Sequence, residues 1–393
     1  MSEIKVNSIK GVAASSAAIT VNNTDGTCTD NITNNLSNKN LIINGAMQVA
    51  QRGTSFTTVA TDTYTLDRMR YHENIDSGVV TITQESITDL PSFTKAIKIN
   101  CTTAETGVPA KAGSKFVALT HFIEAQDCQQ LAYGTSSAKQ ITLSFYVKSN
   151  ITGTFCVSIY KPDQTARNVS LGYTISSANT WEKKTLTFPA DTGGGGIDND
   201  NGSGLEFYFV LARQQGYQGT ASTTWGNNTD ARFANLCTAT IFENTNDHIM
   251  FTGLQLEVGS VATDFEHRSF GAELYLCQRY FETITFQHYG FHGYANSGSS
   301  FDCPVFWTVE KRVAPTVTLP TTGTSDGQMN MANSTGYNST GGSFDAVASI
   351  TKNRCRVGGS GWTAGGGLGL ADGNSITLFG GGNGCTIKID AEL

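Results

Sequence analysis

Apolar and polar residues alternate along much of this chain, and the alternation predicts many short β-strands. A period of two is typical of strands with one buried face. Gly, Asn, Asp and Ser separate the alternating segments, as in Asp76-Ser77-Gly78, where they indicate turns. The predicted strands are the segments 79–84, 95–101, 115–123, 140–149, 153–160, 181–188, 205–211, 238–243 and 249–257. Together they predict a jelly-roll-type β-sandwich over residues 41–268.

The pattern changes from strand to helix near residue 269, without a linker. Leu254, Leu256 and Val258 alternate with polar residues, whereas Leu274, Cys277 and Phe281 recur at steps of three and four. This second spacing predicts a connecting helix at 269–283 with one apolar stripe. Such a helix needs a surface to lie against.

Residues 284–393 predict a smaller C-terminal β domain. The segment from 284 to 295 alternates aromatic and polar residues, and 306–309 and 315–319 add two further strands. Long polar loops on a rigid sheet often carry recognition. We therefore expect either a receptor-contacting distal tip or a purely structural end cap. The candidate glycan-binding residues here are Tyr289, His292, Trp307 and Trp362.

Residues 1–40 contain too few apolar residues to form a core within one chain. Their short apolar clusters suit several copies wrapped around one axis, so we expect an extended trimeric N-terminal stem that docks on a larger particle. A poorly ordered tail is the alternative. The residues expected at this oligomer interface are Ile4, Val6, Ile9, Ile19 and Val21.

Composition agrees with a mainly β structural or adhesive protein. Charged residues make up 15% of the chain, below the usual share of about 25%. The net charge of -7 comes without a Lys or Arg cluster, so we expect no nucleic-acid partner. The sequence has no apolar run of membrane-spanning length and no basic-then-apolar start. We therefore expect no membrane insertion. Composition leaves two alternatives, a cytosolic resident or a particle component that is made in a cytoplasm and released by lysis to act outside the cell.

The nine cysteines are widely spaced and odd in number, so we expect buried free thiols rather than a disulfide framework or a zinc site. We expect no cofactor. Asp198 and Asp200 alternate within a Gly- and Asn-rich segment and form a weak calcium candidate. A solvated turn is the alternative, because the spacing departs from that of an EF-hand loop.

The loop from residue 214 to 232 carries the residue types that bind sugars. An aromatic face can cover the C–H patch of a sugar ring, while carboxylate and guanidinium groups bond its hydroxyls. A loop pinned to its own domain by one buried tryptophan is the alternative. The candidate residues are Tyr217, Trp225, Asp230 and Arg232.

The sequence favours binding over catalysis. It lacks GxSxG, HExxH and Walker-type motifs, and its six histidines are scattered singly. Glycoside hydrolysis needs only two suitably placed carboxylates, which a sequence does not reveal. A glycan depolymerase therefore stays as an alternative, although we expect no enzyme.

Three blocks of the sequence resemble the middle domain of bacteriophage tail-fibre and related virion adhesin proteins. The blocks are NLIINGAMQVAQRGTSF (40–56), YTLDRMRY (64–71) and QLEVGSVATDFEHRSFGAELYLCQRYFE (255–282). Ala46 and Met69 depart from the acidic and aromatic residues common in that family, so ligand-facing details of the blocks are not transferred.

The resemblance implies a virion protein that attaches to host cell-surface glycan as a homotrimer, docked to other virion proteins through its N-terminus. It places the connecting helix near the trimer axis, through Leu274, Cys277 and Phe281. Three identical weak sites on one fibre would then give avidity. A structural connector, tail adaptor or capsid-bound fibre without a ligand is the main alternative.

Overall fold

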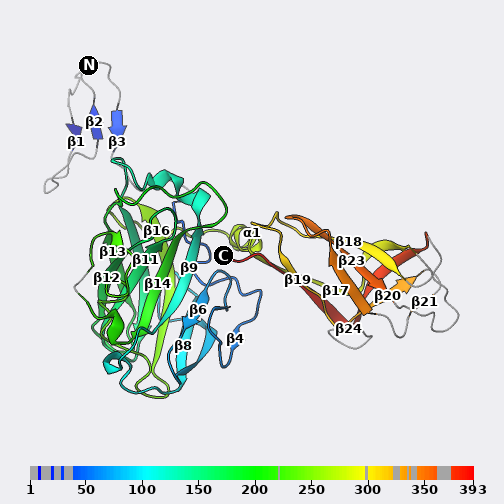
Figure 1. The fold of residues 1–393 in the computed structure, drawn as a ribbon, viewed down its shortest axis with the longest axis horizontal. Coiled ribbons are helices and arrows are strands. Elements are labelled where there is room, and N and C mark those ends of the chain that lie inside the picture. The colour runs from blue at the N-terminus through cyan, green and yellow to red at the C-terminus, as the bar shows by residue number, and fades with distance from the viewer. Residues whose placement is uncertain are drawn as a thin grey trace, which may run out of the picture.

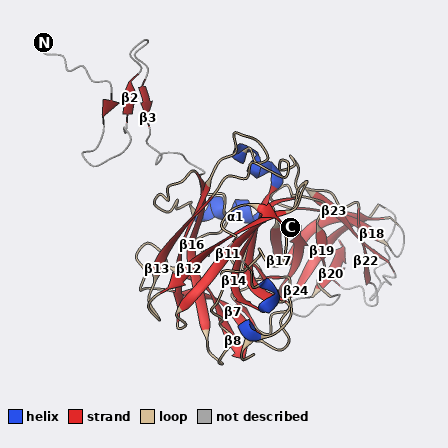
Figure 2. Ribbon diagram, turned by 60° about the vertical axis from the view of Figure 1, so that its left-hand side comes forward, coloured by secondary structure: helices blue, strands red, loops and turns tan. Residues whose placement is uncertain are grey.

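The computed structural model is mainly β, with several antiparallel sheets and a short α-helix (Figures 1 and 2). It describes residues 8–9, 19–21, 28–30, 39–219, 222–296, 300–321, 328–333, 336–337, 343–360 and 373–393. The mainly β fold predicted from the sequence is confirmed. In the described part of the chain, no helix is both long and apolar enough to cross a membrane.

Three short strands near the N-terminus form an antiparallel sheet of their own. They are β1 (Ser8–Ile9), β2 (Ile19–Val21) and β3 (Cys28–Asp30). Of the predicted stem residues, Ile4 and Val6 lie outside the described residues, and Ile9, Ile19 and Val21 are described by their backbone alone. The trimeric stem therefore stays a prediction.

Two antiparallel sheets form a β-sandwich over the middle of the chain (Figure 1). The first, called the β16 sheet, has the order β13 (Glu182–Phe188), β10 (Ile141–Ser149), β16 (His248–Val258), β8 (Lys95–Thr103), β7 (Val79–Ser86), β4 (Ser55–Phe56). The second, called the β14 sheet, has the order β15 (Gly226–Asn227), β12 (Arg167–Ile175), β11 (Gly153–Lys161), β14 (Ser203–Arg213), β9 (Phe116–Glu124), β6 (Arg70–Glu73), β5 (Thr63–Tyr64).

The sandwich core is built from the alternate residues that face between the two sheets. Phe145 of β10 meets Phe209 of β14 with ring centroids 5.4 Å apart, and Tyr173 of β12 at 5.1 Å, both edge to face. All three side chains are buried. Burial of one such side chain stabilises the fold by about 1.5 to 3 kcal/mol. This period-two pattern explains why the strands were visible in the sequence.

A third sheet, called the β24 sheet, follows helix α1 (Phe270–Gln278) and has its own apolar core. Its two longest strands, β17 and β24, pair from Phe281 opposite Asp390 to Tyr294 opposite Ser375. Trp307 and Ile387 are buried in this second core. The strands are β17 (Phe281–Ala295), β18 (Phe301–Phe306), β19 (Thr316–Thr318), β20 (Met329–Asn333), β21 (Gly336–Tyr337), β22 (Ser343–Ala348), β23 (Arg354–Ser360) and β24 (Ser375–Asp390).

Most of the predicted strands are present, and the exceptions have local causes. The segment 238–243 is irregular because its backbone bonds to other elements, as where Thr238 and Ala239 both donate to the Thr154 carbonyl. Residues 307–309 follow β18 instead of forming a strand, since the Trp307 side chain turns into the core. Strand β12 was not among the predicted strands, although Val169, Leu171, Tyr173 and Ile175 alternate with polar residues along it.

The predicted helix at 269–283 is shorter than expected. Helix α1 begins after Ser269, whose hydroxyl accepts a hydrogen bond from the Ala272 amide, and ends at Gln278. Phe281, predicted in the helical stripe, is instead the first residue of β17 and pairs with Asp390. The β-branched residues that follow Phe281 favour a strand, and pairing with β24 decides the boundary.

A network of buried arginines joins the sandwich to the β24 sheet. Arg68, which is 1% exposed, lies 3.5 Å from the ring centroid of Tyr280 and pairs with the Glu392 carboxylate. Arg52 lies 3.6 Å over the Phe281 ring and 3.1 Å from the Asp390 carboxylate. We call this region, with α1 and residues 390–393, the junction; the C-terminus lies beside α1 in both views (Figures 1 and 2).

The three blocks that carry the family resemblance come together at this junction. Gln51 of the first block donates to the Phe281 carbonyl of the third at 2.8 Å. Arg68 of the second block stacks on Tyr280 of the third. The resembling residues therefore build a joint between two β units.

Candidate ligand-binding groove

The outer face of the β14 sheet carries a row of tyrosines and a carboxylate. Antiparallel register places Tyr160 of β11 opposite Glu206 of β14, and Glu206 opposite Phe122 of β9. Tyr208 lies two residues after Glu206 and shares its face, and its hydroxyl donates to the Glu206 carboxylate at 2.6 Å. These side chains point away from the sandwich core, because Phe207 and Phe209 between and beside them point into it.

Residues 214–219 and 222–233 form a wall along this face. Phe233 meets Tyr208 with ring centroids 4.9 Å apart and Phe116 at 5.0 Å. Tyr217, at the end of the short helical turn η3 (Gln215–Tyr217), meets Phe116 edge to face at 5.3 Å. The Ser158 hydroxyl accepts from the Ala234 amide at 3.0 Å. The wall is therefore held by an aromatic cluster and by hydrogen bonds to the sheet.

The outer face of the β14 sheet forms the floor of a small open cavity, and the wall borders it. We call this cavity the tyrosine groove. Its volume is about 160 Å³. Tyr160 and Tyr208 are half-buried, whereas Asn228 and Asp230 are exposed at its rim. The groove combines aromatic rings, hydroxyls, an amide and a carboxylate, which are the groups that recognise a polyhydroxylated ring. The lining residues are Phe116, Tyr160, Tyr208, Tyr217, Asn228, Asp230 and Phe233.

Burial and negative charge set the protonation of the groove. Burial, aided by the nearby Asp163, raises the pKa of the Glu206 carboxyl above its usual value, although Tyr208, Ser203 and Arg70 oppose the shift. Burial and then the Asp230 charge raise the pKa of Tyr217 to about 12. Burial and the Glu206 charge also raise the pKa of Tyr160. The tyrosine hydroxyls are therefore protonated near neutral pH and can donate hydrogen bonds.

Two of the residues predicted from the loop line the groove, and two serve the loop itself. Tyr217 and Asp230 are at the groove. Trp225 is 9% exposed, donates to the Pro189 carbonyl at 2.8 Å, and packs edge to face on Tyr133. The Arg232 guanidinium donates to the Thr224 carbonyl. Trp225 thus has the geometry of the alternative interpretation, in which a tryptophan pins the loop.

The other predicted glycan-binding residues belong to the β24 sheet and are not brought to the groove. Tyr289 is 60% exposed, and the exposed His292 shares a hydrogen bond of 2.9 Å with Thr377. Trp307 is buried, and its indole donates to the Lys352 carbonyl at 2.8 Å. Trp362 lies outside the described residues. A sugar contact at Tyr289 and His292 stays a prediction.

The Asp198 and Asp200 segment has the hydrogen bonds of a turn. The Asp200 side chain accepts from the Gly202 amide at 2.8 Å, and the Asp198 side chain accepts from the Gln164 amide group at 2.8 Å. Within the described residues, no group of three or more acidic, histidine or cysteine side chains is placed to hold a metal ion. These contacts are those of the solvated turn named as the alternative.

The expectation of buried free thiols holds for the cysteines whose side chains the structure describes. They are Cys101, Cys128, Cys156, Cys237, Cys277, Cys303, Cys355 and Cys385, all free and buried.

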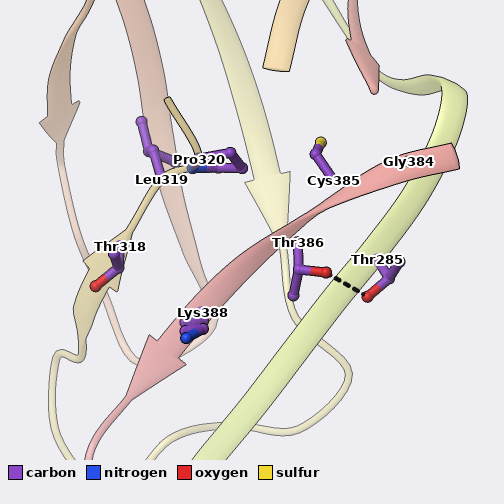
Figure 3. A pocket seen from close by; sticks show the side chains of 8 residues that line it. All are labelled: Thr285, Thr318, Leu319, Pro320, Gly384, Cys385, Thr386 and Lys388. Carbon is purple, nitrogen blue, oxygen red and sulfur yellow. Dashed lines mark hydrogen bonds between the residues drawn. The ribbon is translucent and has the colours of Figure 1, made fainter. Parts of the chain in front are cut away.

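The β24 sheet carries a second cavity, of about 430 Å³ (Figure 3). The hydroxyls of Thr285 and Thr386 share a hydrogen bond of 2.8 Å across strands β17 and β24, and Lys388 lies farther along β24. Burial raises the pKa of the Cys385 thiol to about 11, so that this side chain is a poor nucleophile at neutral pH. Unlike the tyrosine groove, this cavity has no aromatic lining.

The sequence carries a signal for groove residues that were not among the predicted sites. In 205–210, Glu206 and Tyr208 alternate with apolar residues, and in 155–160 the last position of the alternating strand is Tyr160. Large polar aromatics on the face opposite the core of a strand are candidates for contact with a ligand. Their convergence with Asn228 and Phe233, however, depends on how the loop folds over the sheet.

No protein-family model and no curated protein matches this chain. Solved structures to which it is similar include a CBM4 module (14% identity, TM-score 0.28, covering 55% of this chain and 99% of that one). A family 11 carbohydrate-binding module of a Clostridium thermocellum cellulase matches at 11% identity and TM-score 0.26, covering 55% of this chain and 98% of that one.

The enzymatically active domain of tailspike protein 4 of bacteriophage CBA120 also matches (14% identity, TM-score 0.29). That match covers 51% of this chain, which spans 21% of the tailspike chain. At TM-scores of this size the comparisons assign no function to this chain.

Proposed function

We propose that this chain binds carbohydrate through the tyrosine groove. The observation that carries the proposal is the convergence of Tyr160, Tyr208 and Tyr217 with the polar rim of Asn228 and Asp230 in one open cavity. A sugar ring presents apolar C–H patches on its faces and hydroxyls around its edge. Aromatic rings cover such patches, and the rim groups bond the hydroxyls.

We further propose that the protein binds its glycan without cleaving it, as a homotrimeric virion adhesin such as a tail fibre. The support is the sequence resemblance of the three blocks to tail-fibre and virion adhesin proteins. A shallow groove gives a weak individual site, and several sites on one particle raise the effective concentration after the first contact. Incubation with capsule or lipopolysaccharide, followed by product sizing, tests the absence of cleavage; shortened products would contradict it.

Substitution of Tyr160 tests the groove. Tyr160→Ala removes one aromatic surface from the floor without cutting a hydrogen bond given by the structure. We expect affinity for the glycan retained best on a glycan array to fall about tenfold, which corresponds to about 1.4 kcal/mol. Isothermal titration of wild type and variant measures the change, and circular dichroism checks that both are folded.

Tyr294→Ala is the matched control, because this exposed tyrosine of β17 is neither a groove residue nor one of the predicted sugar contacts. We expect it to bind as the wild type does. Tyr289→Ala tests the β24 sheet: loss of binding in Tyr289→Ala, with binding kept in Tyr160→Ala, would move the site to that sheet. Failure of the folded wild-type protein to retain any glycan would remove the proposed function.

A structural connector is the second candidate, and the junction favours it. Buried arginines, paired carboxylates and stacked rings hold the sandwich against the β24 sheet. A rigid joint between two β units is what a spacer needs. A folded protein that binds no host-envelope glycan, yet retains this rigidity, would support the connector.

A further inference from the structure

The charges around the tyrosine groove are unequal in sign. Carboxylates outnumber guanidinium groups here. Asp230 lines the groove, and Glu206 lies beside it and accepts from Tyr208. The charge of Asp163 is close enough to raise the pKa of Glu206. Asp198 and Asp200 extend the negative charge beyond Asp163.

The basic side chains nearby already contact other groups. Arg70 lies 4.4 Å over the Phe122 ring and 3.3 Å from the Asp62 carboxylate. His72, whose ring is 4.7 Å from that of Phe116, is 2.9 Å from the same carboxylate. Arg232 is turned to a loop carbonyl and does not line the groove. Lys161 points into the sandwich, where it is fully buried 3.5 Å from Asp191.

An anionic ligand would therefore meet uncompensated negative charge as it enters. Like charges brought together at a partly desolvated site weaken binding strongly, whereas a neutral ligand escapes this penalty and a cationic one gains from the field. The carboxylates add to this preference, whereas the tyrosine hydroxyls and the Asn228 amide can donate to ligands of either kind. Carboxylate oxygens accept hydrogen bonds from hydroxyls and ammonium groups, but they cannot donate one to a ligand carboxylate, sulfate or phosphate.

We propose that the groove selects uncharged and amine-bearing saccharides and rejects acidic ones. This inference rests on the proposed glycan-binding function and adds the charge class of the ligand. Asp230 is the residue that sets the selectivity most directly, because its carboxylate is exposed at the rim. Glu206 is a positioning residue, since it holds the Tyr208 hydroxyl at the floor.

The test compares matched ligands that differ only in charge. A glycan array grouped by charge identifies the glycan that the full chain retains best, and we expect it to be neutral or amine-bearing. Isothermal titration then compares this glycan with its derivative oxidised at C6 to a carboxylate. We expect the acidic derivative to bind at least about tenfold more weakly at low salt, with a smaller gap at high salt.

Two variants assign the effect to the groove. Asp230→Asn should reduce the gap between the neutral and the oxidised ligand severalfold. Asp264→Asn makes the same change in net charge at an exposed position between β16 and α1 and should leave the gap unchanged. Equal or tighter binding of the oxidised ligand by the wild type would overturn the selectivity alone. If no glycan on the array is retained, the proposed function and this inference both fall.

Discussion

At the scale of single residues, Glu206 is a half-buried carboxyl group beside the tyrosine groove. It is paired in register with Tyr160 and accepts from the Tyr208 hydroxyl. Burial raises the pKa of its carboxyl. The native state therefore holds this proton more tightly than the unfolded chain does, and the ionised form destabilises the fold.

The pH dependence of stability follows from this sign. As pH rises from the ordinary glutamate pKa of about 4.3 through the raised native value, Glu206 should lower the free energy of unfolding. Glu206→Gln removes that dependence while keeping an acceptor for Tyr208. We expect the variant to gain stability relative to wild type as pH rises, by about 1.4 kcal/mol per unit of pKa shift.

Urea unfolding at a series of pH values measures this difference. Asp264→Asn is the control, because its side chain is exposed. A difference between Glu206→Gln and wild type that does not change with pH would show that Glu206 titrates as it does in the unfolded chain.

At the scale of elements, helix α1 has apolar side chains that the rest of the chain leaves exposed. Cys277 is its buried side chain, while Phe270 and Tyr275 are 59% and 57% exposed. Val261, in the segment before the helix, is 56% exposed. Exposed apolar groups of this size often mark a surface that meets another protein. If copies associate here, they use these residues, because Cys277 and Phe281 are covered within one chain.

The homotrimer is the oligomer that the resemblance implies, and the mass of the assembled particle tests it. We expect three chains per particle by light scattering at micromolar concentration. Phe270→Ser together with Tyr275→Ser should weaken an assembly held by α1. Tyr294→Ser, at a comparably exposed tyrosine of β17, should not. A monomeric wild type would contradict the trimer.

At the scale of the whole molecule, the arginine network of the junction fixes how the two β units are joined. The Arg68 guanidinium is buried between Tyr280, the Phe122 carbonyl and the Glu392 carboxylate. Removal of Glu392 leaves a buried charge without its partner. Glu392→Ala should therefore destabilise the protein by about 3 to 5 kcal/mol.

A second substitution separates pairing from packing. Arg68→Leu combined with Glu392→Ala removes both charges, and we expect it to recover part of the loss seen with Glu392→Ala alone, because replacing both partners of a buried pair costs less than breaking it. Thermal unfolding of the two single variants and the double variant measures the coupling. Additive losses would show that Arg68 and Glu392 stabilise the junction independently.

The sequence by itself determined the features that depend on local periodicity. Alternation in segments such as 140–149 and 249–257 predicted the strands, since one face of each is buried and the other is not. The widely spaced cysteines predicted free thiols, and the step from strand spacing to helix spacing located α1 within a few residues. Tyr217 and Asp230 were predicted as sugar contacts from residue types alone, and both line the tyrosine groove.

Only the tertiary structure decided what depends on contacts between distant segments. Pairing of Phe281 with Asp390 ended the helix, and the indole of Trp225 turned toward the Pro189 carbonyl instead of toward solvent. Tyr160 and Tyr208 became groove residues because strand register aligned them and the loop carrying Phe233 folded over them. A period of two tells which face a side chain takes, but not which other side chains will meet it there.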